Sequence, residues 1–192
     1  MPGYSSAIHF IGACWLVFAS VWLVASVSTK RTVYRESAGE RARYWLLLVL
    51  SYLLLTQGRR FPYPLSLILI PRTAWSGWIG AVFCGCGLGL AIWARLILGR
   101  NWSGVVTLKE DHDLIQRGPY HFVRHPIYTG LQSMFLGTAI AFGHLAAFIA
   151  VPLVFVSFWI KLSREERLML QQFPNDYPDY QRRVKRIIPF LL

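Results

Sequence analysis

Long apolar runs alternate with short polar stretches along the chain. Ala7–Ser28 and Trp75–Leu98 each hold about the 20 mostly apolar residues that a helix needs to cross the hydrocarbon core of a bilayer. Ile127–Phe142 and Leu145–Ile160 hold sixteen residues each, about 24 Å of helix at 1.5 Å per residue. Only Gly143–His144 separates these last two runs, so the pattern predicts a tight helical hairpin.

Another apolar run, Tyr44–Thr56, is short for a full span. Two arginines and two prolines follow it between residues 59 and 64, and proline ends a helix because it lacks the amide hydrogen and crowds the preceding turn. The next apolar stretch, Leu65–Ile70, is either a partial insertion or an interfacial segment. Together the runs predict an all-α polytopic integral membrane protein with about five transmembrane helices.

Small residues recur at intervals of four within one predicted span, at Gly77, Ala81, Gly85 and Gly89. Residues four apart share a helix face, and small side chains on such a face let another membrane helix approach closely. The alternative is that glycine is simply common in membrane helices. We expect a packing face without a catalytic role.

Basic residues predict the orientation of the chain in the membrane. Thr29–Arg43 carries five Lys or Arg and Lys161–Arg186 carries seven, whereas no Lys or Arg precedes the first run. Cytoplasmic loops are enriched in Lys and Arg, so both basic segments and the polar stretch between residues 99 and 123 are expected in the cytoplasm, with the N-terminus outside. Because no basic residue precedes it, the first run is interpreted as a transmembrane helix rather than a cleaved leader.

Composition supports a membrane protein and argues against other classes. Hydrophobic residues make up 55% of the 192 residues and charged residues only 15%, against about 25% charged in soluble domains. The net charge of +11 could attract nucleic acid, but the charges lie in blocks between apolar runs and no nucleic-acid-binding motif is present. The cysteines, Cys14, Cys84 and Cys86, form no metal-type pair and are expected as buried free thiols.

Three polar patches are expected to meet on the cytoplasmic face: Asp111–Ile115, Gly118–Gly130 and Lys161–Arg167. The last holds adjacent carboxylates, Glu165 and Glu166, directly after an apolar run. Carboxylates at this position either face a protein-lined cavity or belong to an ordinary solvated helix end. Composition alone leaves both interpretations open.

Histidines within the second patch raise the question of a metal. His121 and His125 are four residues apart, as in a helical metal pair, but Pro126 pushes the residue before it out of helical geometry, so no metal site is predicted. A pocket for an organic ligand fits better, because Tyr120 and Tyr128 supply flat faces that attract cations.

The ordered pattern HxL(I/V)xxGPYxxxRHPxYxG, from His112 to Gly130, is followed by a hydrophobic hairpin, by Glu165–Glu166 and by Tyr177–Pro178–Asp179–Tyr180. This order resembles the isoprenylcysteine carboxyl methyltransferase family, which is related to the phospholipid N-methyltransferases. The likeness covers about half of the chain. It implies an enzyme that binds S-adenosylmethionine at the cytoplasmic end of the hairpin and receives a lipophilic methyl acceptor from the bilayer, among membrane lipids.

The resemblance also implies a role for particular residues. Residues that match the cofactor-binding motifs of the family are His112, Leu114, Ile115, Tyr120, His125, Pro126, Ile127, Tyr128 and Glu165. Residues expected to act on the acceptor are Lys161, Arg164 and Glu166. The family has an arginine at the position of Lys161, and since lysine lacks the bidentate grip of arginine on a carboxylate, the acceptor stays open between a carboxylate, an amine and a thiol. For an amine acceptor, Glu166 or His121 is a candidate base.

The resemblance divides the chain into an N-terminal region of three transmembrane helices, residues 1–98, and a catalytic region, residues 99–192. Other interpretations of the sequence are a phospholipid N-methyltransferase, a small-thiol methyltransferase and a nicotinamide-dependent sterol-type reductase. A membrane assembly subunit, whose basic face holds anionic lipid headgroups, is the alternative outside the enzymes.

Overall fold

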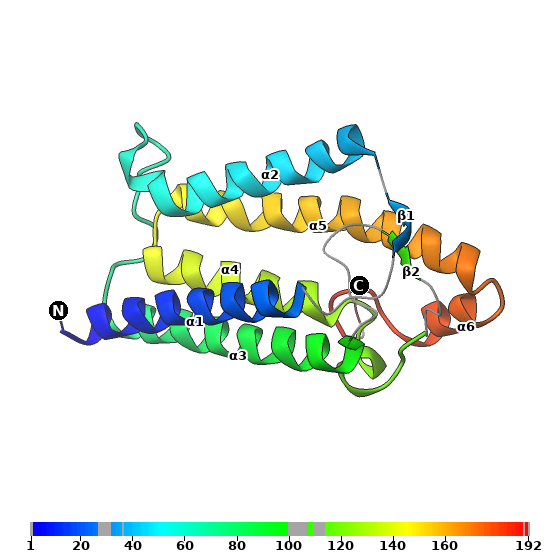
Figure 1. Cartoon of the computed structure of the whole chain (residues 1–192). Coiled ribbons are helices and arrows are strands. Elements are labelled where there is room, and N and C mark those ends of the chain that lie inside the picture. The colour runs from blue at the N-terminus through cyan, green and yellow to red at the C-terminus, as the bar shows by residue number, and fades with distance from the viewer. Residues whose placement is uncertain are drawn as a thin grey trace.

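A computed structural model describes residues 2–26, 32–35, 37–99, 107–109, 114–189 and 191. Within these ranges five long helices form the body of the protein (Figure 1). They are α1 (Pro2–Ser26), α2 (Ala38–Gln57), α3 (Ala74–Leu98), α4 (Pro126–Phe142) and α5 (Leu145–Gln172). The shorter elements are η1 (Gly58–Arg60), η3 (Gly118–His121) and α6 (Asp176–Arg183).

Three of the described helices, α1, α3 and α5, are long and apolar enough to cross a membrane. The structure therefore supports an integral membrane protein of helical class. The helix α4 has 17 residues and α2 has 20 residues with a charged first half, so a count of five spans stays a prediction.

Helix ends differ from those predicted at several places. The first helix begins at Pro2 instead of Ala7, the second begins at Ala38 instead of Tyr44, and α5 continues to Gln172 instead of ending at Ile160. Hydropathy marks the part of a helix that suits lipid, whereas backbone hydrogen bonding continues through charged residues that face water or protein. The second helix is consequently not short, and Lys161–Arg167 lies within α5.

A small sheet accompanies the helices and was not predicted. Two strands, β1 (Thr32–Arg35) and β2 (Thr107–Lys109), pair in antiparallel orientation. The all-α prediction is thus confirmed for the bundle and wrong for these two segments. Strands shorter than the usual five or six residues, with partners far apart in the chain, leave no pattern in a single sequence.

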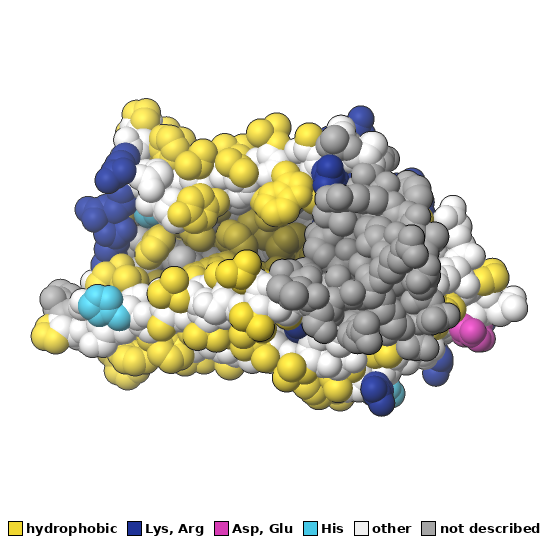
Figure 2. Space-filling model, viewed as in Figure 1, with side chains coloured by type: hydrophobic (Ala, Val, Ile, Leu, Met, Phe, Trp, Pro, Cys, Tyr) yellow, Lys and Arg dark blue, Asp and Glu magenta, His cyan; other side chains and the backbone are white. Residues whose placement is uncertain are grey.

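The helices pack in the order α1, α3, α4, α5, α2. The hairpin of α4 and α5 turns at Gly143, which has a left-handed φ of 73°, and His144 caps α5 by accepting a hydrogen bond from the amide of Ala147 at 3.0 Å. The helices α1 and α2 stand at the two ends of this order. Figure 2 shows that the viewed face is hollowed between them and that hydrophobic side chains line the hollow.

Glycines bring α3 and α4 into the closest helix contact. A Cβ atom added to Gly87 or to Gly80 would come closer than 3.0 Å to the carbonyl oxygen of Gly130 or of Gly137. The predicted small-residue face is only partly right. Its first member, Gly77, packs against Tyr4 and Ala7 of α1, whereas Gly89 has nothing within 4 Å.

The glycine contact predicts opposite effects for two alanine substitutions on α3. Gly87→Ala should lower the free energy of unfolding by about 1–3 kcal/mol, because backbones in a packed contact must move apart. Gly89→Ala adds the same methyl group in open space and should be neutral or slightly stabilising, because alanine favours helix. Thermal unfolding of both variants in the same detergent measures the difference, and equal melting temperatures would contradict the packing described here.

Candidate active site

The site is built where two segments meet before α4. Gly118 has a φ of 61° and opens η3, and His125 has a non-helical φ of −128° because Pro126 follows it. His125 therefore stays outside the helix α4, which begins at Pro126. The amides of Arg124 and His125 donate to the carbonyls of Lys185 and Arg186 at 2.8 and 3.0 Å, which holds the C-terminal segment beside the start of α4.

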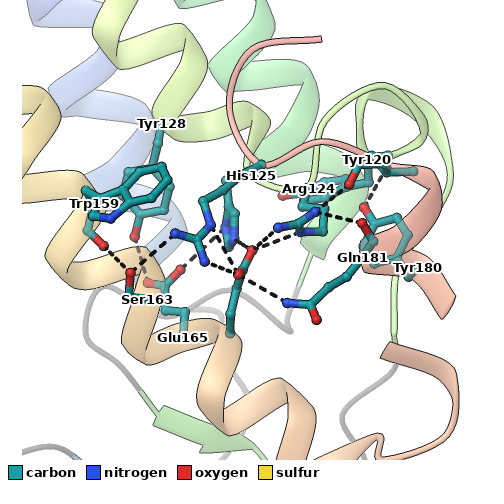
Figure 3. A network of polar contacts seen from close by, with 12 residues as sticks. Tyr120, Arg124, His125, Tyr128, Trp159, Ser163, Glu165, Tyr180 and Gln181 are labelled. Atoms are coloured by element: carbon teal, nitrogen blue, oxygen red, sulfur yellow. Dashed lines mark hydrogen bonds and ion pairs between the residues drawn. The ribbon is translucent and has the colours of Figure 1, made fainter. Parts of the chain in front are cut away.

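The carboxylate of Glu166 lies at the centre of this arrangement. Figure 3 labels three of the residues that contact it, Arg124, His125 and Gln181. Glu166 is 2% exposed. One oxygen accepts from Arg124 Nε at 2.8 Å and lies 3.1 Å from His125 Nε2. The other accepts from Arg186 Nε at 3.1 Å and from Gln181 Nε2 at 3.2 Å. Both oxygens are thus satisfied by cationic or amide donors, as a buried carboxylate requires.

The adjacent carboxylate, Glu165, has a different environment. Its side chain is 23% exposed, and it accepts a hydrogen bond from the Tyr128 hydroxyl at 2.7 Å. Lys161 Nζ lies 3.9 Å away, and His125 Nδ1 lies 3.8 Å from its other oxygen. The ammonium of Lys161 also sits over the rings of Tyr44 and Tyr128, 5.7 and 5.5 Å from their centroids. Aromatic faces and a carboxylate around one spot create a place that favours positive charge.

His125 stands between the two carboxylates. Its two ring nitrogens face Glu166 and Glu165 respectively, and its side chain is 11% exposed. The ring therefore lies between the ion pairs of Glu166, which are mostly buried, and those of Glu165, which are partly exposed. Which nitrogen carries the proton depends on the hydrogen bond that each makes.

Tyrosines of α6 close the site on the C-terminal side. Burial raises the pKa of Tyr177 and of Tyr180, and the negative charge of Glu166 adds to the effect. These phenols therefore keep their protons, and the Tyr180 hydroxyl donates to the carbonyl of Tyr120 at 2.5 Å. This bond connects α6 to η3.

The structure brings five of the predicted site residues into one cluster: His125, Tyr128, Lys161, Glu165 and Glu166. It places the others around the cluster. Tyr120 and Ile127 pack with Ala94 of α3, and Ile115 lies against the same group.

The remaining predicted residues lie at the margins. Leu114 packs on Tyr177 and Tyr180, Pro126 is buried at the start of α4 and Arg164 is partly exposed on α5. His112 lies outside the described residues. His121 is exposed, and within the described ranges no three His, Cys, Asp or Glu side chains gather as a metal site would need.

Sequence reasoning missed Arg124, Arg186 and Gln181, which surround Glu166, and Tyr44, which faces Lys161. A signal for the arginines was present. A carboxylate beside an apolar run needs buried counter-charges, and the segments that contain Arg124 and Arg186, Gly118–Gly130 and Lys161–Arg186, were already expected on the same side of the membrane. Nothing in the sequence indicated which cations pair with Glu165 and which with Glu166, because this depends on the direction in which each side chain leaves the helix.

Comparisons with known proteins place this helical membrane protein among the membrane methyltransferases. The chain belongs to the phospholipid methyltransferase family, whose sequence profile matches residues 75–176. This match covers just over half of the chain and includes α4, α5 and nearly all of α3, together with the site residues from Tyr120 to Glu166. The resemblance inferred from the motifs is therefore confirmed.

The chain is similar to protein-S-isoprenylcysteine O-methyltransferases. It is 28% identical to that of Schizosaccharomyces pombe over 160 residues, 77% of this chain and 67% of the relative. It is 32% identical to that of Tribolium castaneum over 123 residues, 61% of this chain and 43% of the relative. A solved eukaryotic intramembrane Ras methyltransferase, isoprenylcysteine carboxyl methyltransferase, matches with a TM-score of 0.62 and 26% identity, over 98% of this chain and 66% of that one.

The two carboxylates should contribute unequally to stability. Glu166→Gln should lower the free energy of unfolding by about 3–5 kcal/mol, because Arg124 and Arg186 would keep their buried charges without a counter-charge. Glu165→Gln, the matched change one residue away, should cost less than about 1 kcal/mol, since its ion pair is partly exposed. Thermal unfolding in detergent compares the two variants, and a loss of equal size would show that Glu166 is not the anchor.

Proposed function

We propose that this chain transfers a methyl group from S-adenosylmethionine to a lipophilic acceptor that reaches the site from the bilayer. The main support for this proposal is the cluster of Glu165, Tyr128, His125 and Lys161, which lies at the end of an apolar hollow. When bound, the donor supplies an activated methyl group on a sulfonium cation. The residues of this chain bind, orient and shield the reactants.

The chemistry of the cluster fits such a donor. Glu165 presents a partly exposed carboxylate that can accept hydrogen bonds or attract a positive group, and Tyr44 and Tyr128 offer faces that attract cations. Glu166 is not free to bind a ligand in this way, because both of its oxygens already accept hydrogen bonds from arginine side chains. We therefore assign cofactor binding to Glu165, Tyr128 and His125, and a supporting role to Glu166.

The apolar hollow supports a lipophilic acceptor. Trp15 of α1 and Leu48 of α2 pack against one buried cluster, formed by α2, α4 and α5, that includes Phe135. The ring centroids of Trp15 and Phe135 are 5.1 Å apart. Tyr128 lies on the same face of α4, two turns from Phe135. An apolar chain held between α1 and α2 would thus end beside Lys161.

A carboxylate is the acceptor that the site suits best. An amine must lose a proton during the reaction, but Glu166 is held in ion pairs with Arg124 and Arg186, so it is a poor base. A carboxylate is already anionic, and Lys161 can attract it as a point charge. Most of the rate enhancement would then come from positioning the two reactants in line.

A phospholipid amine is the second candidate, favoured by the name of the matching family. A small thiol or another lipophilic acceptor is a third. In all cases residues 1–98 would form most of the wall for the acceptor, and residues 99–192 would hold the reacting groups.

The proposed orientation follows from charge. Among the described residues most Lys and Arg lie at the end of the bundle that holds the site, and this end is accordingly assigned to the cytoplasm. The N-terminus at the opposite end (Figure 1) is then outside. All five long helices would span the membrane, the shorter α4 by tilting less or by local thinning of the bilayer.

Binding of the demethylated product, S-adenosylhomocysteine, tests the site. His125→Ala and Glu165→Gln should each weaken it by about tenfold or more, the loss expected for a hydrogen bond to a charged group. Asp176→Asn, an exposed carboxylate on α6, is the matched control and should bind as the original chain does. Isothermal titration calorimetry makes the measurement, and unchanged affinity in both site variants would refute the assignment.

Membrane vesicles test both the methyl transfer and the side of the membrane from which the methyl donor reaches the site. Methyl-labelled S-adenosylmethionine, which is charged and does not cross lipid, should label the lipid fraction of inverted vesicles and not of right-side-out vesicles. If the acceptor is a carboxylate, mild base should release the label from the ester. Label that resists base would favour an amine or thiol, and labelling of right-side-out vesicles alone would contradict the orientation.

A further inference from the structure

Three arginines lie at the end of the bundle opposite the candidate active site. All nine Asp and Glu of the chain fall between residues 36 and 40, 110 and 113, or 165 and 179. The segment 41–109 contains none of them, although it includes Arg59, Arg60 and Arg72. No carboxylate from this segment or from 114–164 is therefore available to neutralise these three arginines.

The three arginines belong to one surface. η1 carries Arg59 and Arg60, both exposed, and rests on the turn between α4 and α5, where Gly58 leaves no room for a side chain beside His144. Arg72 donates from Nε to the carbonyl of Phe142 in the same turn at 3.0 Å. Figure 2 shows dark blue Lys and Arg side chains gathered at this end.

Electrostatics at His144 agrees with this geometry. Burial lowers the pKa of His144, and the positive charges of Arg72 and Arg59 lower it further. Both guanidinium groups are thus close enough to the turn to disfavour a charge on His144. The partners that the structure gives Arg60 and Arg72 are uncharged: the Gln57 side-chain oxygen at 2.6 Å and the Phe142 carbonyl.

The surroundings of the arginines are those of a membrane interface. Tyr63 is 78% exposed and Trp75 is 80% exposed, and such aromatic side chains are enriched at the level of lipid headgroups. Leu67–Leu69 is 41–48% exposed and is fixed to the turn by backbone hydrogen bonds, including Leu69 N to Gly143 O at 2.7 Å. Apolar and aromatic groups beside uncompensated cations suit a lipid better than a free anion.

We propose that Arg59, Arg60 and Arg72 form a binding site for the headgroup phosphate of an anionic phospholipid in the leaflet opposite the candidate active site. Arginine binds phosphate oxygens through two parallel N–H donors, and a net negative headgroup supplies a counter-charge that none of the described residues at this end provides. Tyr63 and Trp75 contact the glycerol and upper acyl region. The site is separate from methyl transfer and does not depend on the proposed function.

Native mass spectrometry of the full chain in detergent tests this site. The protein is incubated with equal concentrations of phosphatidylglycerol and phosphatidylcholine of the same acyl length, and the ratio of the two bound lipids is measured. We expect a clear preference for phosphatidylglycerol in the original chain. Arg59→Gln combined with Arg60→Gln should reduce that preference by about tenfold or more, because each basic side chain near a membrane surface contributes about 1 kcal/mol.

Two control variants separate the site from general charge and from folding. Arg43→Gln combined with Arg182→Gln removes the same charge from exposed positions at the other end and should keep the preference. Arg59→Lys combined with Arg60→Lys keeps the charge and should retain most of the preference. Equal binding of both lipids by the original chain, or equal loss in the Arg43 and Arg182 control, would overturn the proposal.

Free phosphate distinguishes a lipid site from a simple anion site. Inorganic phosphate at the concentration of the lipid should not displace phosphatidylglycerol, because it gains nothing from Tyr63, Trp75 and the apolar loop. Displacement by phosphate would show that the arginines bind the anion alone and would refute the lipid assignment.

Discussion

The neutralised carboxylate of Glu166 is the interaction on which the site depends. It joins α5 to the start of α4 through Arg124 and to the C-terminal segment through Arg186. Removing one partner of such a cluster leaves an uncompensated buried charge, so the loss of any one of these side chains destabilises the contact among all three segments. The same carboxylate contacts one ring nitrogen of His125, so the ring faces Glu165 with its other nitrogen. The buried ion pairs of Glu166 therefore fix the position of His125 beside the partly exposed Glu165.

Helix packing explains how an apolar hollow and a polar cluster can lie side by side in a small bundle. Close contact between α3 and α4 through glycines makes a compact centre, and α1 and α5 pack on its two sides. The helix α2 then packs on α5 instead of returning to α1, which leaves the hollow of Figure 2 between them. Arg95, buried in α3, donates to the carbonyl of Ala25 at 2.8 Å and keeps the end of α1 in place near the site.

The sequence was sufficient for the helical class, the hairpin and most of the polar cluster around His125, because these follow from apolar runs and from an ordered motif. It could not distinguish Glu165 from Glu166, since adjacent carboxylates have the same local pattern and differ only in the neighbours that the fold supplies. The closest glycine contact was also missed. Gly80 and Gly87 are seven residues apart and share a face with each other. The interval of four led instead to Gly77, Ala81 and Gly85, which pack against α1, and to Gly89, which has nothing within 4 Å.

Neighbouring residues on an α-helix point about 100° apart, and this rotation gives Glu165 and Glu166 different ion-pair partners. Inserting one residue between the His144 cap and these carboxylates would place Glu165 where Glu166 now faces Arg124 and Arg186, and deleting one residue would place Arg167 there. The loops of this chain can therefore change in length during evolution or in engineering, while the distance along α5 from its cap to the site must stay constant.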